Sequence, residues 1–105
     1  MAILVDLDGT LAEYHGWTSY TPVGNPVPKM VERVKKWIAQ GEDVRIFTAR
    51  ACDPSEVPEV EAWCAKHLGV ILPVTNVKEW DAEEIWDDRA IGVRLNTGER
   101  ADGLE

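Results

Sequence analysis

Short apolar runs alternate with amphipathic segments along this chain, and that alternation restricts the folds that it can adopt. Residues 2–6 are a short apolar run typical of a buried strand, and further strands are predicted at residues 44–48, 70–74, 84–87 and 91–95. Strands that alternate with helices form right-handed βαβ units, which build a parallel sheet with helices on both faces. The sequence therefore predicts an α/β fold: a three-layer, Rossmann-like domain with a five-stranded, mainly parallel sheet.

Two segments between these runs have apolar side chains at helical spacing. Residues 27–38 carry charged side chains opposite the apolar stripe and are followed by Gly41, which can end a helix. The second segment begins near Ser55, which can cap a helix, and stops at Gly69. Both segments are therefore predicted to be helices that pack their apolar side chains into the core.

Length and charge limit the classes of function. The 105 residues suit one domain, and we expect residues 1–105 to form it. The formal net charge of −8 disfavours binding to extended nucleic acid and to anionic membranes, because both reward Lys and Arg. No apolar run is long enough to span a membrane, and no signal peptide is visible. Cys52 and Cys64 form no CxxC pair, so we expect a cytoplasmic protein with reduced thiols.

Polar side chains gather where predicted strands end, which is where ligands bind in parallel α/β sheets. They are Asp6, Asp8, Thr48, Arg50, Asp87 and Asp88, and Lys78 lies in the loop before the fourth run. Each has an ordinary explanation by itself, because Asp-Gly is a common turn and single Lys, Arg and Thr residues are common on surfaces and strands. Their joint placement favours a site.

The chemistry of these side chains indicates the ligands. Carboxylates that converge on one edge repel one another, and a hard divalent cation such as Mg²⁺ relieves that repulsion. A lysine and a hydroxyl beside the cation would then suit a phosphate dianion. The sequence therefore predicts a Mg²⁺ site that binds a phosphorylated substrate.

The same residues resemble the motifs of the haloacid dehalogenase superfamily of phosphohydrolases, over most of the chain from residue 3 to about 90. The first motif, DxDGT, is Asp6-Leu7-Asp8-Gly9-Thr10, directly after an apolar strand. The second is Thr48 in IFTAR, the third is Lys78 in TNVKEWD, and the fourth is Asp87-Asp88 in IWDDRA. The resemblance implies the sheet order 5-4-1-2-3. Neither gap between the motifs and the predicted helices can hold a cap domain, so the chain resembles the small capless members.

The resemblance also implies a mechanism for a phosphomonoester hydrolase. Asp6 would be the nucleophile that forms an aspartyl-phosphate, and Asp8 would be the general acid and then the general base. Mg²⁺ would be bound by the Asp6 carboxylate, the Asp8 main-chain carbonyl and Asp87, with Asp88 acting directly or through water.

Further residues would hold the substrate. Thr48 would donate a hydrogen bond to the phosphoryl group, and Lys78 would neutralise charge, a role that Arg50 or Arg89 could take over. The predicted substrate-binding set is Gly9, Thr10, Thr48, Arg50 and Lys78.

Residues 13–25 lack helical periodicity and could form a hairpin or an ordered loop, and the resemblance implies that they are a flap over the site. Residues 99–105 are expected to form a C-terminal tail. The aromatic and histidine side chains of the flap either contact the leaving group or pack the loop onto the core; they are Tyr14, His15, Trp17 and Tyr20. A site without a cap is open, which favours a bulky phosphorylated substrate or a lid from a second subunit of a homo-oligomer. We expect the partner to be a phosphorylated substrate that is small or has an exposed phosphate.

Three alternatives stay open. A phosphatase or phosphotransferase for nucleotides or polynucleotide ends needs only a few Arg contacts despite the acidic composition. A relative that binds Mg²⁺ and phosphate without turnover would carry the same residues. A phosphorylatable receiver module also gathers acids, a Thr and a Lys at a sheet edge, but its phosphoacceptor ends a strand well inside the chain, where Thr48 stands here.

Overall fold

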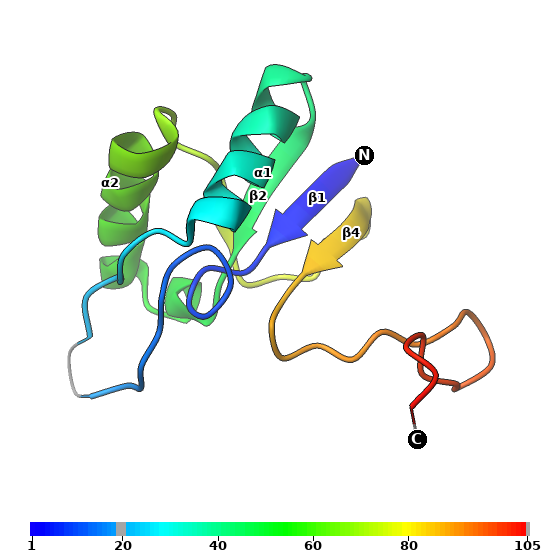
Figure 1. Cartoon of the computed structure of the whole chain (residues 1–105). Coiled ribbons are helices and arrows are strands. Elements are labelled where there is room, and N and C mark those ends of the chain that lie inside the picture. The colour runs from blue at the N-terminus through cyan, green and yellow to red at the C-terminus, as the bar shows by residue number, and fades with distance from the viewer. Residues whose placement is uncertain (19–20, 105) are drawn as a thin grey trace.

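The structure is a computed structural model that describes residues 1–18 and 21–104. Within these residues, four strands, two α-helices and two short 3-10 helices follow one another along the chain (Figure 1). They are β1 (Ala2–Val5), α1 (Pro28–Ala39), β2 (Asp43–Phe47), η1 (Ala49–Cys52), η2 (Pro54–Glu56), α2 (Val57–Leu68), β3 (Val74–Thr75) and β4 (Ala82–Trp86).

The strands form one sheet in the order β3-β2-β1-β4, and every pairing in it is parallel. The predicted parallel α/β architecture is therefore confirmed, and so are the relative positions of its first four strands. All four residues of β1 are buried, because β1 lies between β2 and β4. The ends of β1 and β4 consequently lie side by side, and Asp6 donates its N–H to the carbonyl of Trp86 at 2.8 Å.

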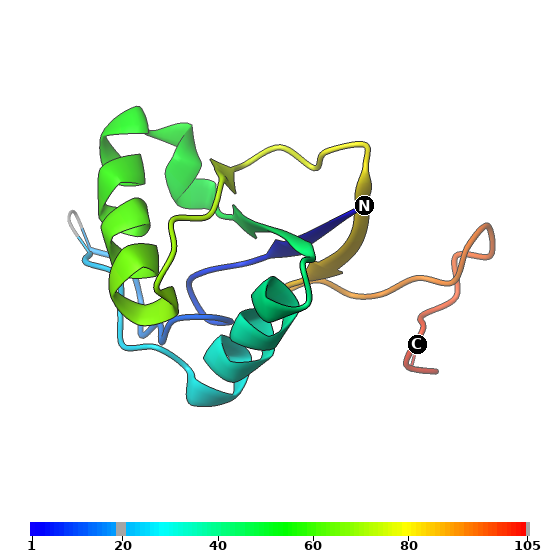
Figure 2. The same ribbon diagram turned by 90° about the horizontal axis from the view of Figure 1, so that it is seen from above.

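Both helices lie on the same face of the sheet, so the prediction of helices on both faces, and with it the three-layer architecture, is wrong (Figure 2). Ile3 and Val5 pair in register with Val44 and Ile46, and these four side chains share one buried cluster with both helices. Two right-handed crossovers that advance in the same direction, from β1 to β2 and from β2 to β3, place their helices on the same face.

A loop takes the place of a helix on the opposite face. The chain must pass from β3 back across β2 and β1 to reach β4, and residues 76–81 make that crossing without a helix. The side chain of Arg45 in β2 lies on this opposite face, because it alternates along the strand with the core-facing side chains of Val44 and Ile46. Its guanidinium binds Glu79 at 2.9 Å and Asp81 at 2.9 Å, both in the crossing loop. The short connection therefore explains the missing layer.

The predicted fifth strand over residues 91–95 does not form in the sheet. Only residues 87–90 separate that segment from β4, whereas a parallel neighbour needs a crossover of about a dozen residues. The segment instead continues into a C-terminal stretch in which Val93 makes an isolated antiparallel bridge with Arg100. Figure 1 shows this stretch extending away from the sheet.

The predicted third strand is shorter and later than its apolar run. Residues 70–73 do not form a strand, and β3 consists of Val74 and Thr75 alone. The carbonyl of Pro73 accepts a hydrogen bond from the N–H of Ile46 at 2.8 Å, while the proline nitrogen has no proton to donate.

Among the described residues, no helix is long and apolar enough to cross a membrane.

Candidate active site

An acidic cluster lies beyond the carboxyl ends of β1 and β4. Carboxylate oxygens of Asp6, Asp87 and Asp88 lie within 4.8 Å of one another. Asp6 comes directly after β1, and Asp87 and Asp88 come directly after β4, so the pairing of these two strands creates the cluster. Three oxygen donors at this spacing suit a hard divalent cation, which makes the cluster a candidate metal centre.

The turn after β1 connects the two sides of the cluster. The hydroxyl of Thr10 lies 3.1 Å from an oxygen of Asp6 and 3.1 Å from an oxygen of Asp88, and it accepts the N–H of Asp88 at 3.0 Å. Gly9 allows this approach because its φ is +93°, and a Cβ there would lie 2.8 Å from Asp88 Oδ2. Gly9 and Thr10 therefore shape the acidic cluster.

The cluster raises the affinity of Asp6 for protons. Burial is the largest cause, followed by the nearby charge of Asp87 and the contacts with Asp88, and together they raise the pKa of Asp6 from 3.8 to about 7. The hydrogen bond from Thr10 opposes this shift. A bound cation would favour the ionised carboxylate instead, so metal binding and proton release are coupled at this site.

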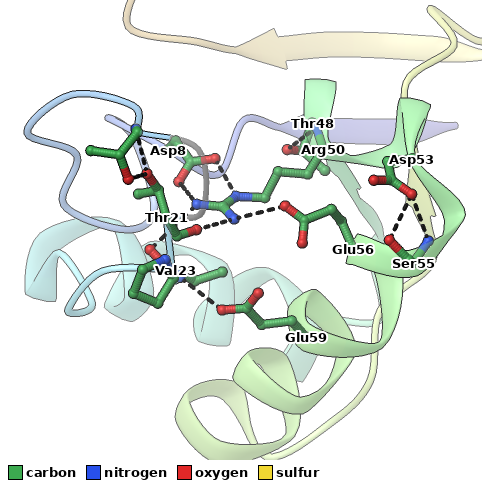
Figure 3. A network of polar contacts seen from close by, with 11 residues as sticks. Asp8, Thr21, Val23, Thr48, Arg50, Asp53, Ser55, Glu56 and Glu59 are labelled. Carbon is green, nitrogen blue, oxygen red and sulfur yellow. Dashed lines mark hydrogen bonds and ion pairs between the residues drawn. The ribbon is translucent and has the colours of Figure 1, made fainter.

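Asp8 is directed to a different partner from Asp6. Both of its carboxylate oxygens accept hydrogen bonds from Arg50, from Nε at 2.8 Å and from Nη2 at 2.9 Å (Figure 3). The side chain of Asp8 is therefore not a member of the acidic cluster. Its predicted ligation of a metal concerned only the main-chain carbonyl, which this contact leaves free.

Thr48 ends the sheet beside Asp8 and begins a short helix. It is buried, and its hydroxyl accepts the N–H of Arg50 at 3.2 Å, which caps η1. The hydroxyl proton is left for another acceptor, as a contact to a phosphoryl oxygen requires. The η1 turn in the same way directs the Arg50 side chain back toward Asp8.

The flap is anchored at several points by the body of the protein. Glu13 donates its N–H to the carbonyl of Asn25 at 2.8 Å, which closes the loop at its base. The indole of Trp63 in α2 donates to the carbonyl of Gly24 at 2.8 Å, and Glu59 accepts the N–H of Val23 at 3.1 Å. Tyr20, a predicted contact for the leaving group, lies outside the described residues.

A cavity of about 970 Å³ joins these groups. The predicted site residues that line it are Asp6, Asp8, Thr48, Arg50, Asp87 and Asp88, with Tyr14 and Trp17 from the flap. Lys78 is exposed and does not line this cavity, whereas Arg89 and Asn76 do. The structure therefore brings most of the predicted residues together and separates Lys78 from them.

Seven lining residues were not predicted: Phe47, Ala49, Cys52, Asp53, Glu56, Asn76 and Ala90. Asn76 follows β3 directly, so the rule that ligands bind past strand ends could have identified it. Asp53 and Glu56 reach the cavity through η1 and η2, whose short turns give no periodic signal in the sequence.

Comparison with known proteins supports the fold. A solved structure described as a conserved protein from Bacteroides thetaiotaomicron resembles this chain with a TM-score of 0.68 and 24% sequence identity. The match covers 90% of this chain and 81% of that one. No family model matches the sequence, and no curated protein matches it.

Proposed function

We propose that this protein is a Mg²⁺-dependent phosphomonoester hydrolase that acts through an aspartyl-phosphate, as the resemblance to the haloacid dehalogenase superfamily implies. One observation carries the proposal. Asp6, Asp87 and Asp88 come within metal-binding distance of one another and line a cavity that Asp8 and Thr48 also line.

The three carboxylates fit Mg²⁺ because it prefers oxygen ligands and keeps several waters. Asp6, Asp87 and Asp88 would hold it, and the ion would screen Asp6 from the phosphate and stabilise charge on the phosphoryl oxygens. The hydroxyl of Thr10 would keep the Asp6 and Asp88 carboxylates in place.

The chemistry then divides between two aspartates. An oxygen of Asp6 attacks phosphorus and forms an acyl phosphate while the bond from phosphorus to the leaving oxygen breaks. Asp8, which must enter this step protonated, gives that proton to the leaving oxygen and becomes a carboxylate. In the second step Asp8 takes a proton from water, the water oxygen attacks phosphorus, and phosphate leaves with the Asp6 carboxylate restored. Thr48 donates a hydrogen bond to the phosphoryl group throughout.

We assign the cationic role beside the phosphate to Arg89 in place of Lys78, because Arg89 lines the cavity and Lys78 does not. Arg89→Met should raise KM for a phosphomonoester about tenfold, whereas Lys78→Met should change it less than twofold, on the scale of a lost charge-assisted hydrogen bond. The reverse ranking would return the role to Lys78.

A nucleotide is a second candidate substrate, favoured by Tyr14 and Trp17 in the cavity wall. Aromatic side chains stack on bases and contribute about 1–3 kcal/mol per base. A substrate with a nucleic acid end would show a steep loss of affinity with salt, whereas a mononucleotide would show a shallow one.

The test of the proposed activity is phosphate release from a chromogenic aryl phosphate, measured with Mg²⁺ and with a chelator. Asp6→Asn should abolish turnover, and Asp81→Asn is the matched control because Asp81 binds Arg45 away from the cavity. Mg²⁺-dependent turnover that Asp6→Asn retains would exclude Asp6 as the nucleophile. Folded protein that binds Mg²⁺ but turns over neither aryl nor nucleoside phosphates would favour the non-catalytic alternative.

A further inference from the structure

Arg50 was predicted to bind substrate, and in the structure its guanidinium forms hydrogen bonds and ion pairs with other residues of the protein. Besides Asp8, it donates from Nη1 to the carbonyl of Thr21 at 2.8 Å and lies 3.6 Å from Glu56 (Figure 3). It also lies 4.9 Å from the ring of Trp17. The residue is only 5% exposed. This buried side chain therefore contacts Asp8 and the flap at the same time.

We propose that Arg50 is a positioning residue that orients the Asp8 carboxylate toward the leaving-group oxygen and ties that orientation to the flap. The inference rests on the proposed phosphatase activity and deepens it. A guanidinium that donates two parallel N–H bonds to one carboxylate fixes the plane of that carboxylate as well as its distance.

The distribution of charge supports this role. Asp6 and Asp8 are two residues apart, yet the buried cation is placed on Asp8 and the candidate metal centre on Asp6. Asp8 therefore has a cationic partner within the protein, whereas Asp6 would have one only in a bound metal ion. The side chain of Asp8 is 19% exposed and lines the cavity, so the oriented carboxylate can still reach a ligand.

The flap contacts extend the role beyond a single ion pair. Arg50 contacts the carbonyls of Thr21 and Pro22 at 2.8 and 3.4 Å, and Trp17 lies over its guanidinium. One side chain thus connects the backbone of the flap to the proton donor. A substrate that contacts the flap would be sensed at Asp8 through Arg50.

The proposal predicts a dependence on the leaving group. Proton donation is needed for a basic alkoxide and is nearly dispensable for an acidic nitrophenolate. We therefore compare kcat/KM, which reports the reaction up to the first irreversible step, for an alkyl phosphate and a nitrophenyl phosphate with Mg²⁺ present. Arg50→Met should reduce kcat/KM about 100-fold for the alkyl ester and less than about threefold for the nitrophenyl ester, within the range of general acid catalysis.

Controls separate positioning from folding. The ratio of the two substrates within one variant does not depend on the fraction of folded enzyme, so partial unfolding cannot imitate the effect. Arg45→Met is the matched control, because Arg45 binds Asp43, Glu79 and Asp81 outside the cavity and should leave the ratio unchanged. Arg50→Lys keeps the charge without the two-pronged geometry and should give an intermediate ratio.

A double-mutant cycle completes the test. If Arg50 acts through Asp8, Arg50→Met should change the alkyl ester less than about twofold when Asp8→Asn is already present. Equal losses on both esters, or independent losses from the two substitutions, would overturn the proposal. Wild-type protein inactive on both esters would instead reject the proposed function itself, which distinguishes the two failures.

Discussion

At the scale of single residues, the two aspartates of the DxDGT segment show how position decides chemistry. Asp6 lies in a cluster of carboxylates, whereas Asp8 lies against Arg50. Sequence spacing could predict that both reach the carboxyl edge of the sheet. It could not predict the partner of Asp8, because the Arg50 side chain is aimed by the non-periodic turn η1.

The raised pKa of Asp6 predicts how stability depends on pH without metal. The unfolded chain ionises Asp6 near pH 3.8, whereas the folded protein holds the proton up to about pH 7. The stability contributed by this proton is therefore present below pH 3.8 and is lost as pH rises to about 7. In chelator at pH 8, Asp6→Asn should unfold roughly 5 °C above wild type.

Thermal unfolding at pH 5 and pH 8 checks this prediction. Mg²⁺ should raise the unfolding temperature of wild type more at pH 8 than at pH 5, since its carboxylate ligands must be ionised. Asp6→Asn should lose most of that gain. A Mg²⁺ effect that is equal at both pH values would contradict the assignment of Asp6 to the metal centre.

Gly9→Ala should disturb the acidic cluster. The new Cβ would meet the Asp88 carboxylate at 2.8 Å, and the φ of +93° strains any residue with a side chain. We expect a loss of at least about 1 kcal/mol in stability and a weaker affinity for Mg²⁺. Gly41→Ala is the control, since its φ is also positive and no atom lies within 4 Å of its Cβ. Equal Mg²⁺ affinity in both variants would argue against a role for Gly9 in the site.

At the scale of elements, the helices and most strands followed from periodicity, and the failures have physical causes. The stripe over residues 27–38 gave α1 nearly to its bounds. Residues 91–95 carry an alternating strand pattern, but the four-residue connection after β4 prevents them from joining a parallel sheet. A local sequence pattern reports which structure the side chains prefer. It does not report whether the connection is long enough for the strand to join a parallel sheet.

Trp63 tests the anchoring of the flap on α2. Trp63→Phe keeps an aromatic side chain in the core and removes the hydrogen bond to the carbonyl of Gly24. We expect a loss of about 1 kcal/mol in stability and faster proteolytic cleavage between residues 13 and 25. Trp37→Phe on α1 is the control, because the Trp37 ring packs against Trp86 of β4, with the ring centroids 5.2 Å apart. Cleavage that is unchanged in Trp63→Phe would show that other contacts hold the flap.

At the scale of the whole molecule, the architecture has fewer layers than predicted. Helices cover one face of the sheet, and the loop of residues 76–81 crosses the other. The predicted side chains at the ends of β1, β2 and β4 still line one cavity, because local sequence identifies these strand ends well. Lys78 lies outside the cavity lining for the complementary reason. It lies in the crossing loop, whose path is set by Arg45 and its acidic partners far along the chain.

The C-terminal stretch should be dispensable for folding and for the site. Removal of residues 91–105 leaves β4 and the cavity residues Asp87, Asp88 and Arg89 intact. We expect the unfolding temperature to stay within about 2 °C of the full chain and Mg²⁺ affinity to be unchanged. A larger drop would show that this stretch packs on the sheet in solution.

The most direct test of the central claim is detection of the phosphorylated intermediate. The protein would be mixed with a phosphomonoester and Mg²⁺, quenched in acid during turnover, digested and examined by mass spectrometry. We predict one phosphoryl group on Asp6, labile to base and absent when chelator replaces Mg²⁺. Turnover accompanied by an unmodified Asp6, or by a phosphoryl group on another residue, would contradict the mechanism.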